Sequence, residues 1–226
     1  MQNAVLAPAA NDDPVAARAA ERALAGRRTA YAEEVRRLID AGSAVMRRTG
    51  SIDPKVSDIV GEAGLSNQAF YRHFRSKDEL LLAILDDGLE RLVGYLEHRM
   101  ATTPDPLVRV RRWIEGIFAQ AADPTAAEAT RPFAVDGARL RDRFPEESAR
   151  SVAGVKAPLV AAIRDARASG AAPGADPARD ADAIYHLAMG CTNQRLVDRA
   201  APTKRDVTHV VEFALAAITR TSRRGA

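Results

Sequence analysis

Apolar side chains recur every three to four residues through most of the 226-residue chain. That spacing places them along one face of an α-helix, whereas a strand would alternate apolar and polar positions. No segment shows a convincing alternation, so we expect an all-α fold of about nine helices. The expected helices cover residues 29–48, 56–63, 67–73, 77–100, 106–121, 126–143, 146–169, 177–198 and 203–220.

These helices fall into two expected domains behind an N-terminal arm. Residues 1–27 are rich in alanine and carry few large apolar side chains, so we expect a flexible arm there. Its arginines either touch DNA or belong to an untethered tail; they are Arg18, Arg22, Arg27 and Arg28. Residues 28–76 form a small domain of three helices. The long helix from residue 77 to about 100 then bridges to a larger domain. Residues 77–226 comprise this bridging helix and the larger domain.

A glycine-bearing turn separates two short helices near the middle of the small domain. The first helix carries apolar residues at helical spacing from Val56 to Ala63, and Gly64 accepts the left-handed backbone that ends a helix. Ser66 follows at the position of an N-cap, where its hydroxyl accepts a bond from a free backbone N–H. Two short helices joined by such a turn indicate a helix-turn-helix motif.

The second of these helices has a surface suited to DNA. Between residues 64 and 77 the sequence has no acidic side chain but several basic ones. Lys and Arg neutralise phosphates, and Asn and Gln can bond base edges through two hydrogen bonds. Asn67 and Gln68 stand beside the Ser66 cap, at the end of a recognition helix where base contacts concentrate. The pattern predicts double-stranded DNA as a partner.

The stretch GLSNQAFYRHFRSKDEL resembles the signature of the tetracycline-repressor (TetR) family of bacterial transcription regulators. The residues that carry the resemblance are Ile59, Gly64, Leu65, Ser66, Tyr71, His73, Phe74, Lys77 and Leu80. By this resemblance, Tyr71, His73 and Lys77 contact phosphates, and Asn67 and Gln68 approach bases. The resemblance covers roughly residues 34–85, and beyond residue 100 only the layout of a helical sensor domain is similar.

Some positions depart from the family pattern or have two open interpretations. Ala69 lacks the hydroxyl that the family places there, and Lys55 stands where the family usually has Thr. Lys55 can reach a phosphate but cannot cap the helix, so we expect Asp53 to cap it. Arg47, at the end of the preceding helix, either interacts favourably with the helix dipole or contacts the DNA backbone.

The TetR-like layout implies a homodimer in which the last two helices of each subunit pair into a four-helix bundle. Ala214 and Ala217, beside Val211 and Ile218, permit close packing there, although the same residues also fit an intramolecular core. A pocket for an unidentified small-molecule effector is expected among the four helices before the last. Its candidate residues, each of which also fits ordinary core or surface, are Trp113, Phe118, Phe133, His186, Met189 and Asn193.

Composition narrows the remaining classes of protein. The net charge of +3 is mild, so the local basic surface is the better evidence for a nucleic-acid partner. The single cysteine, Cys191, excludes an internal disulfide and fits a reducing compartment. No apolar run approaches the roughly 18 residues of a membrane span, and the N-terminus does not resemble a secretory signal, so we expect a cytoplasmic protein without a membrane partner.

The sequence does not predict an enzyme. The four histidines have no metal-ligand spacing with one another or with Cys191, and no phosphate-binding, dinucleotide-binding or nucleophile motif is present. We therefore expect no catalytic residues, no cofactor and no metal. The predicted function is a ligand-responsive, dimeric regulator that represses transcription from a palindromic DNA operator. An activator, a ligand-independent DNA binder and a helical interaction scaffold without DNA binding are the alternatives.

Overall fold

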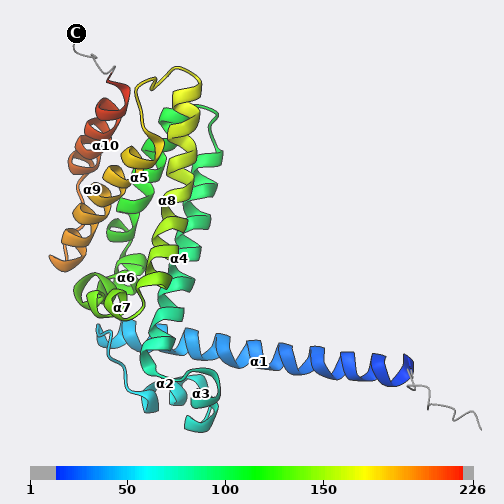
Figure 1. The fold of residues 1–226 in the computed structure, drawn as a ribbon. Helices are drawn as coiled ribbons and strands as arrows, with labels where there is room; N and C mark the ends of the chain where they lie inside the picture. Colours follow the sequence, from blue (N-terminus) through cyan, green and yellow to red (C-terminus); the bar gives the residue numbers. More distant parts are fainter. Residues whose placement is uncertain (1–13, 221–226) are drawn as a thin grey trace, which may run out of the picture.

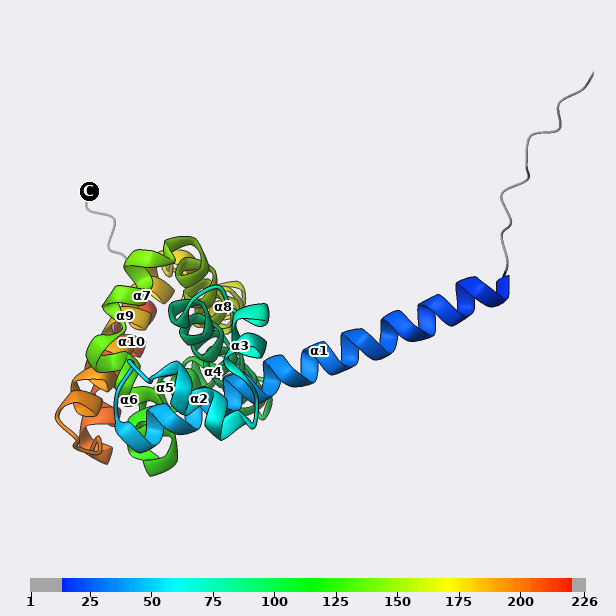
Figure 2. The same ribbon diagram turned by 90° about the horizontal axis from the view of Figure 1, so that it is seen from below.

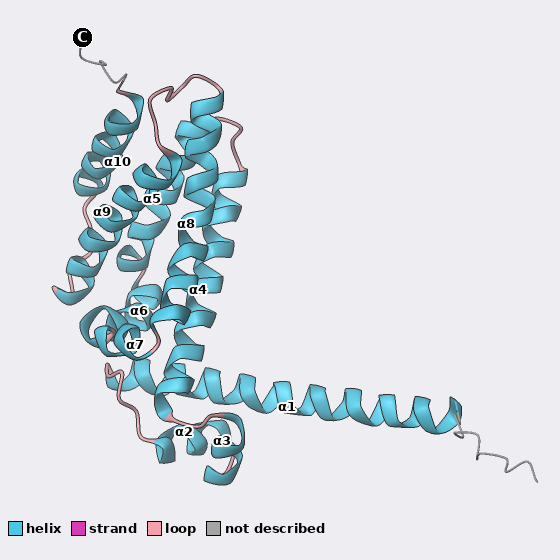
Figure 3. Ribbon diagram, viewed as in Figure 1, coloured by secondary structure: helices cyan, strands magenta, loops and turns pink. Residues whose placement is uncertain are grey.

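The fold consists of helices joined by short connections (Figure 1, Figure 3). The computed structural model describes residues 14–220, and within that range it holds ten helices and no strand, which confirms the expected all-α class. The helices are α1 (Pro14–Thr49), α2 (Val56–Ala63), α3 (Asn67–His73), α4 (Lys77–Ala101), α5 (Pro106–Ala122), α6 (Pro124–Asp136), α7 (Ala138–Arg143), α8 (Pro145–Ala168), α9 (Pro177–Val197) and α10 (Lys204–Thr219). In this described part of the chain, no helix has both the length and the apolar surface that a membrane crossing requires.

The first helix starts much earlier than the sequence predicted. α1 begins at Pro14 rather than near residue 29, so residues 14–27 of the expected flexible arm are helical. Alanine, arginine and leucine are strong helix formers and dominate this stretch, so the anchored part of α1 can extend outward without an apolar face to bury. Residues 1–13 of the expected arm lie outside the described range.

A second difference concerns α6 and α7, which the sequence predicted as one helix interrupted near Pro132. α6 runs through Pro132 and ends at Asp136, and Gly137 separates it from α7. The backbone is so tight there that a Cβ atom on Gly137 would lie 2.3 Å from the carbonyl oxygen of Phe133. The glycine rather than the proline therefore sets the break, and it adds a helix to the expected nine.

Most helix starts are fixed by side-chain caps. In each case a hydroxyl or carboxylate oxygen accepts backbone N–H bonds from the first turn. The caps are Ser76 for α4, Asp105 for α5, Asp123 for α6, Asp176 for α9 and Thr203 for α10. The three aspartates each precede a proline at the start of the helix, where the missing N–H breaks no helical bond.

Two hydrophobic cores share the long helix α4. The first core joins α1, α2, α3 and the start of α4, and among its members Leu38, Ile59, Phe70 and Leu80 are fully buried. It also contains Leu140 from α7, which is fully buried as well. The larger part of the protein thus contributes a side chain to the core of the small helical domain.

The second core joins the upper part of α4 with α5, α8, α9 and α10. Its fully buried members include Leu96, Trp113, Leu159 and Val211. These helices stand as an upright bundle with α9 and α10 along one side, while α2 and α3 lie at the base (Figure 1). α1 crosses the base, and its N-terminal part projects away from the body on the side opposite α9 and α10 (Figure 1, Figure 2).

Candidate nucleic-acid interface

The turn between α2 and α3 is built on Gly64. This residue has φ 62° and ψ 38°, the left-handed conformation that favours glycine. The N–H of Leu65 then bonds to the carbonyl oxygen of Val60 at 2.9 Å, which closes the end of α2. α1 holds the turn from behind, because the Arg37 guanidinium donates to the carbonyl oxygens of Ala63 and Gly64. These bonds set the direction in which α3 leaves the turn.

Ser66 caps α3 as the sequence predicted. Its hydroxyl accepts a bond of 3.1 Å from the N–H of Ala69. Ala69 and Phe70 then face inward, and the Phe70 ring is fully buried in the core of the small domain. Ala69 is 6% exposed, so it is a packing residue rather than a residue that faces a partner.

The opposite face of α3 is open to solvent. Asn67 and Gln68 are exposed in the first turn, and Tyr71 is 61% exposed one turn later. At about 100° per residue the three side chains lie on one side of the helix. Two amides and a phenol at the free N-terminal end of a short helix match what base edges and phosphates in the major groove require.

Carboxylates of neighbouring segments hold two cations that flank this face. The Lys77 ammonium pairs with the Asp53 carboxylate, and the Arg72 guanidinium pairs with Glu34 of α1. The hydrogen bond from Lys77 lowers the pKa of Asp53, and the bonds from His73 and Arg72 lower the pKa of Glu34. Ion pairs in exposed positions are weak, so a phosphate can replace either carboxylate. The phosphate contact of Lys77 stays a prediction, and the structure adds an acidic partner that the sequence did not reveal.

His73 is not available to a phosphate, and the prediction of that contact is wrong. Its side chain is 0% exposed, and its Nε2 lies 2.6 Å from the Glu34 carboxylate. The ring also packs edge-on against Tyr31, with ring centroids 4.2 Å apart. His73 follows Tyr71 by two residues, which turns it by about 200° around α3 and toward α1. It therefore fastens the end of α3 to α1.

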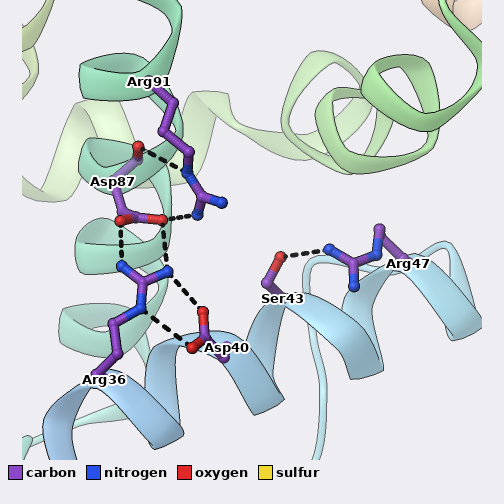
Figure 4. Close-up of polar contacts among 6 residues, drawn as sticks. All are labelled: Arg36, Asp40, Ser43, Arg47, Asp87 and Arg91. Atoms are coloured by element: carbon purple, nitrogen blue, oxygen red, sulfur yellow. Dashed lines mark hydrogen bonds and ion pairs between the residues drawn. The ribbon is translucent and has the colours of Figure 1, made fainter. Parts of the chain in front are cut away.

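Arg47 lies on the wrong side of α1 for the predicted DNA contact. Its guanidinium donates to the Ser43 hydroxyl at 3.1 Å (Figure 4). Arg47 also lines a groove together with Arg131 of α6. Arg47 follows Arg36 by three helical turns and so shares the face of α1 that looks toward the larger domain. The backbone-contact interpretation of Arg47 is therefore not supported.

The start of α2 also differs from the prediction. Lys55 occupies the N-cap position, and no side chain caps this helix. Asp53, the expected cap, turns toward Lys77 instead. The Lys55 side chain is exposed at the base of the small domain, where it remains a candidate for a phosphate contact.

A charge network that the sequence analysis missed connects α1 to α4 (Figure 4). The Arg36 guanidinium lies 2.5 Å from the Asp87 carboxylate of α4 and 2.5 Å from Asp40 of α1, and Arg91 also pairs with Asp87. The spacing of four residues between the charged partners within each helix is visible in the sequence. The pairing of Arg36 with Asp87, which lies 51 residues later, is not. The network connects α1, which packs against α3, to α4, which enters the larger domain.

Known proteins that resemble the N-terminal part of this chain agree with this geometry. Residues 38–84, which run from the buried part of α1 into α4, match the family model described as bacterial regulatory proteins, tetR family. Residues 38–84 thus form a domain of the tetR type. The chain is 33% identical to the transcriptional activator FasR of Mycolicibacterium smegmatis over 93 residues. The aligned segment covers 41% of this chain and 42% of FasR. The match thus spans about two fifths of that relative's length.

Solved structures are similar in fold to this chain over most of its length. The transcriptional regulator FadR from Bacillus subtilis, in complex with stearoyl-CoA, superposes with a TM-score of 0.61 at 18% identity, over 81% of this chain and 96% of FadR. SmeT, the repressor of the Stenotrophomonas maltophilia multidrug efflux pump SmeDEF, gives a TM-score of 0.64 at 22% identity, over 83% of this chain and 91% of SmeT. At these identities the likeness concerns the fold alone.

The residues predicted to line an effector pocket do not converge. Trp113 is fully buried, and its indole N–H donates to the carbonyl oxygen of Val155 at 3.1 Å, as in an ordinary core. Phe133 packs against the core of the small domain. The His186 side chain is 70% exposed and lies 3.7 Å from the Asp182 carboxylate. The structure places these three candidates in three separate environments.

The remaining candidates lie near α9. Met189 and Asn193 are half-buried on that helix, and Phe118 of α5 forms part of the floor of a groove of about 1050 Å³ between α9 and α10. The walls of the groove are polar, with the Arg195 guanidinium 2.9 Å from the Asp206 carboxylate. The groove opens onto the same helices that the tetR layout assigns to the dimer.

Three of the four residues predicted to form the dimer contact are buried within the subunit, whereas Ala217 is exposed. Val211, Ala214 and Ile218 are at most 2% exposed and belong to the larger core, which favours the intramolecular alternative for them. The exposed large apolar side chains on these two helices are Phe213, 61% exposed, and Val197, 48% exposed. Ala217 follows Phe213 by about one helical turn, so these exposed residues identify the face of α9 and α10 that is the candidate contact.

Proposed function

We propose that the protein is a ligand-responsive, dimeric, DNA-binding transcriptional regulator that represses its target genes and leaves its operator when a small molecule binds. The observation that carries the proposal is the exposed first turn of α3. Asn67, Gln68 and Tyr71 share its outer face, while Phe70 anchors the inner face. A rigid helix with this surface fits the major groove. The regulator would act in the cytoplasm on double-stranded DNA.

A homodimer through α9 and α10 completes the proposal. Two recognition helices must enter major grooves about 34–36 Å apart, and a two-fold dimer presents them to a palindromic operator. Exposed Phe213 and Val197 support this contact, because large apolar side chains on adjacent helices gain free energy when a second copy covers them.

In this proposal, residues 28–76 read the operator, and residues 77–226 bind the effector and the second subunit. α4 transmits the signal, because its start belongs to the first core and its end to the second. The effector shifts the equilibrium only by its differential affinity for the two helix arrangements. The complex of FadR with stearoyl-CoA favours a long-chain acyl-CoA as the first effector to test.

Activation of transcription is the second candidate function, and the name of the relative FasR as an activator favours it. The two functions predict opposite effects of deleting the gene. Transcripts next to the bound operator should rise if the protein represses them and fall if it activates them.

The proposal is tested by selecting bound duplexes from a randomised DNA pool and measuring mobility shifts with the selected sequence. Tyr71→Ala should weaken the complex about tenfold or more, because it removes a hydrogen bond to a charged phosphate in each subunit. Tyr95→Ala is the matched control, since Tyr95 is a partly exposed tyrosine on α4, away from α3. Failure of the wild-type protein to select any duplex would refute DNA binding, and equal losses in both variants would refute the role of α3.

A further inference from the structure

The N-terminal part of α1 extends far beyond what the small domain needs. The core uses α1 only from Val35 and Leu38 onward, whereas residues 17–33 are exposed throughout. Residues 14–30 add about 26 Å of helix at 1.5 Å per residue. This segment, which we term the α1 extension, leaves the body past α3 on the side opposite α9 and α10 (Figure 1, Figure 2).

The α1 extension is basic. Residues 14–30 contain four arginines and a single acidic residue, Glu21. Arg27 and Arg28 are exposed, and neither guanidinium makes a hydrogen bond or ion pair with another residue in the described part of the chain. A projecting helix with this charge attracts a polyanion more strongly than it attracts an apolar surface.

The arginines point to different sides of the helix. Arg27 precedes Glu34 by seven residues, about two turns, and Glu34 contacts Arg72 and His73 of α3. Arg27 therefore lies on the face of α1 that looks toward α3. Arg22 precedes Arg36 by fourteen residues, about four turns, and Arg36 reaches α4. Arg22 therefore faces the larger domain.

We propose that the α1 extension lies along the DNA outside the half-site that α3 reads, with Arg27 contacting a phosphate there. This inference rests on the proposed DNA binding. Because the extension points away from α9 and α10, it runs outward from the two-fold axis of the proposed dimer. Its length corresponds to about seven to eight base pairs at roughly 3.4 Å each. The extension enlarges the footprint and adds affinity that does not depend on base sequence.

The test compares three full-length proteins, wild type, Arg27→Gln and Arg22→Gln, on one selected duplex that carries long flanks. Hydroxyl-radical footprinting should show that wild type protects sugars beyond both half-sites. Arg27→Gln should lose only this outer protection and lower the slope of log affinity against log salt by about two for a dimer. Arg22→Gln makes the same change in charge on the opposite face of the helix. It should keep the outer protection and most of the slope of log affinity against log salt.

The outcomes separate this inference from the proposed function. A footprint that ends at the outer edge of the half-sites would refute the inference while leaving operator binding intact. Equal effects of the two substitutions would refute the assigned face. If Leu24→Ser, a change at an exposed apolar residue of the extension, altered the oligomeric state of the free protein in sedimentation, the extension would serve a second copy instead of DNA. No selected duplex at all would refute the proposed function itself.

Discussion

Asp53 holds the Lys77 ammonium in an ion pair beside α3, and replacing Asp53 with asparagine should strengthen DNA binding. In the free protein the carboxylate competes with phosphate for Lys77. The pair is exposed on the Asp53 side, where 62% of the side chain is accessible. Asp53→Asn removes both this competition and the repulsion between the carboxylate and the DNA backbone.

The size of the effect follows from the exposure of the pair. Exposed ion pairs shift an equilibrium by a factor of about 1.4 to 5. Because a dimer breaks two such pairs, Asp53→Asn should raise the affinity for the operator about two- to thirtyfold at low salt. The gain should shrink as salt rises, since salt screens exposed charges.

Fluorescence anisotropy with a labelled operator duplex measures the gain. Glu97→Gln is the control, because it makes the same change in net charge at an exposed site about 30 Å along α4 from Lys77. In a Lys77→Ala background Asp53→Asn should lose most of its effect, which a double-mutant cycle quantifies. The reasoning is refuted if Asp53→Asn and Glu97→Gln raise the affinity equally, or if the gain in the Lys77→Ala background is as large as in the wild type.

Three further substitutions test the core, the base contacts and the pH dependence. Leu140→Ala should destabilise the protein by about 2–5 kcal/mol in chemical denaturation because it removes a fully buried side chain, and a loss below about 1 kcal/mol would contradict its place in the first core. Gln68→Ala should cost about 1–3 kcal/mol at one base pair of the operator, and an unchanged base preference in a competition assay would exclude the contact. The bonds from His73 and Arg72 lower the pKa of Glu34, so they stabilise the fold above the usual value of 4.5 and lose this contribution as the pH falls. Glu34→Gln should therefore flatten the acid limb of a stability profile, and an unchanged limb would count against the contribution of Glu34.

The elements that could be predicted from the sequence are those fixed by local chemistry. The bounds of α2 and α3 agree with the prediction because one glycine and one serine determine where the first helix ends and the second begins. Gly64 needs only its own backbone freedom, and Ser66 needs only an N–H three residues away. The exposed face of α3 follows from the same periodicity once Phe70 is identified as the buried side.

Side-chain direction between distant segments could not be predicted in the same way. His73 and Arg72 meet Glu34 across 38 to 39 residues of sequence, so nothing near either residue reveals that one is buried and the other paired. The pocket candidates failed for a related reason. Aromatic residues at helical spacing are typical of a core and of a pocket alike, and only the packing of α5 against α8 shows that Trp113 has its hydrogen-bond partner inside the core.

The position of α3 depends on the larger domain through a short series of contacts. His73 ties α3 to Glu34 of α1, and α1 is tied to α4 by the pair between Arg36 and Asp87. The start of α4 is held in turn by α7, because the buried Asp78 carboxylate pairs with the guanidinium groups of two arginines. These are Arg139, at 2.9 Å, and Arg143. Leaving that carboxylate buried without its partners is costly, so a displacement of α7 favours a new position for the start of α4. We therefore expect an effector that moves α7 to change the angle at which α3 meets DNA, without having to unfold either core.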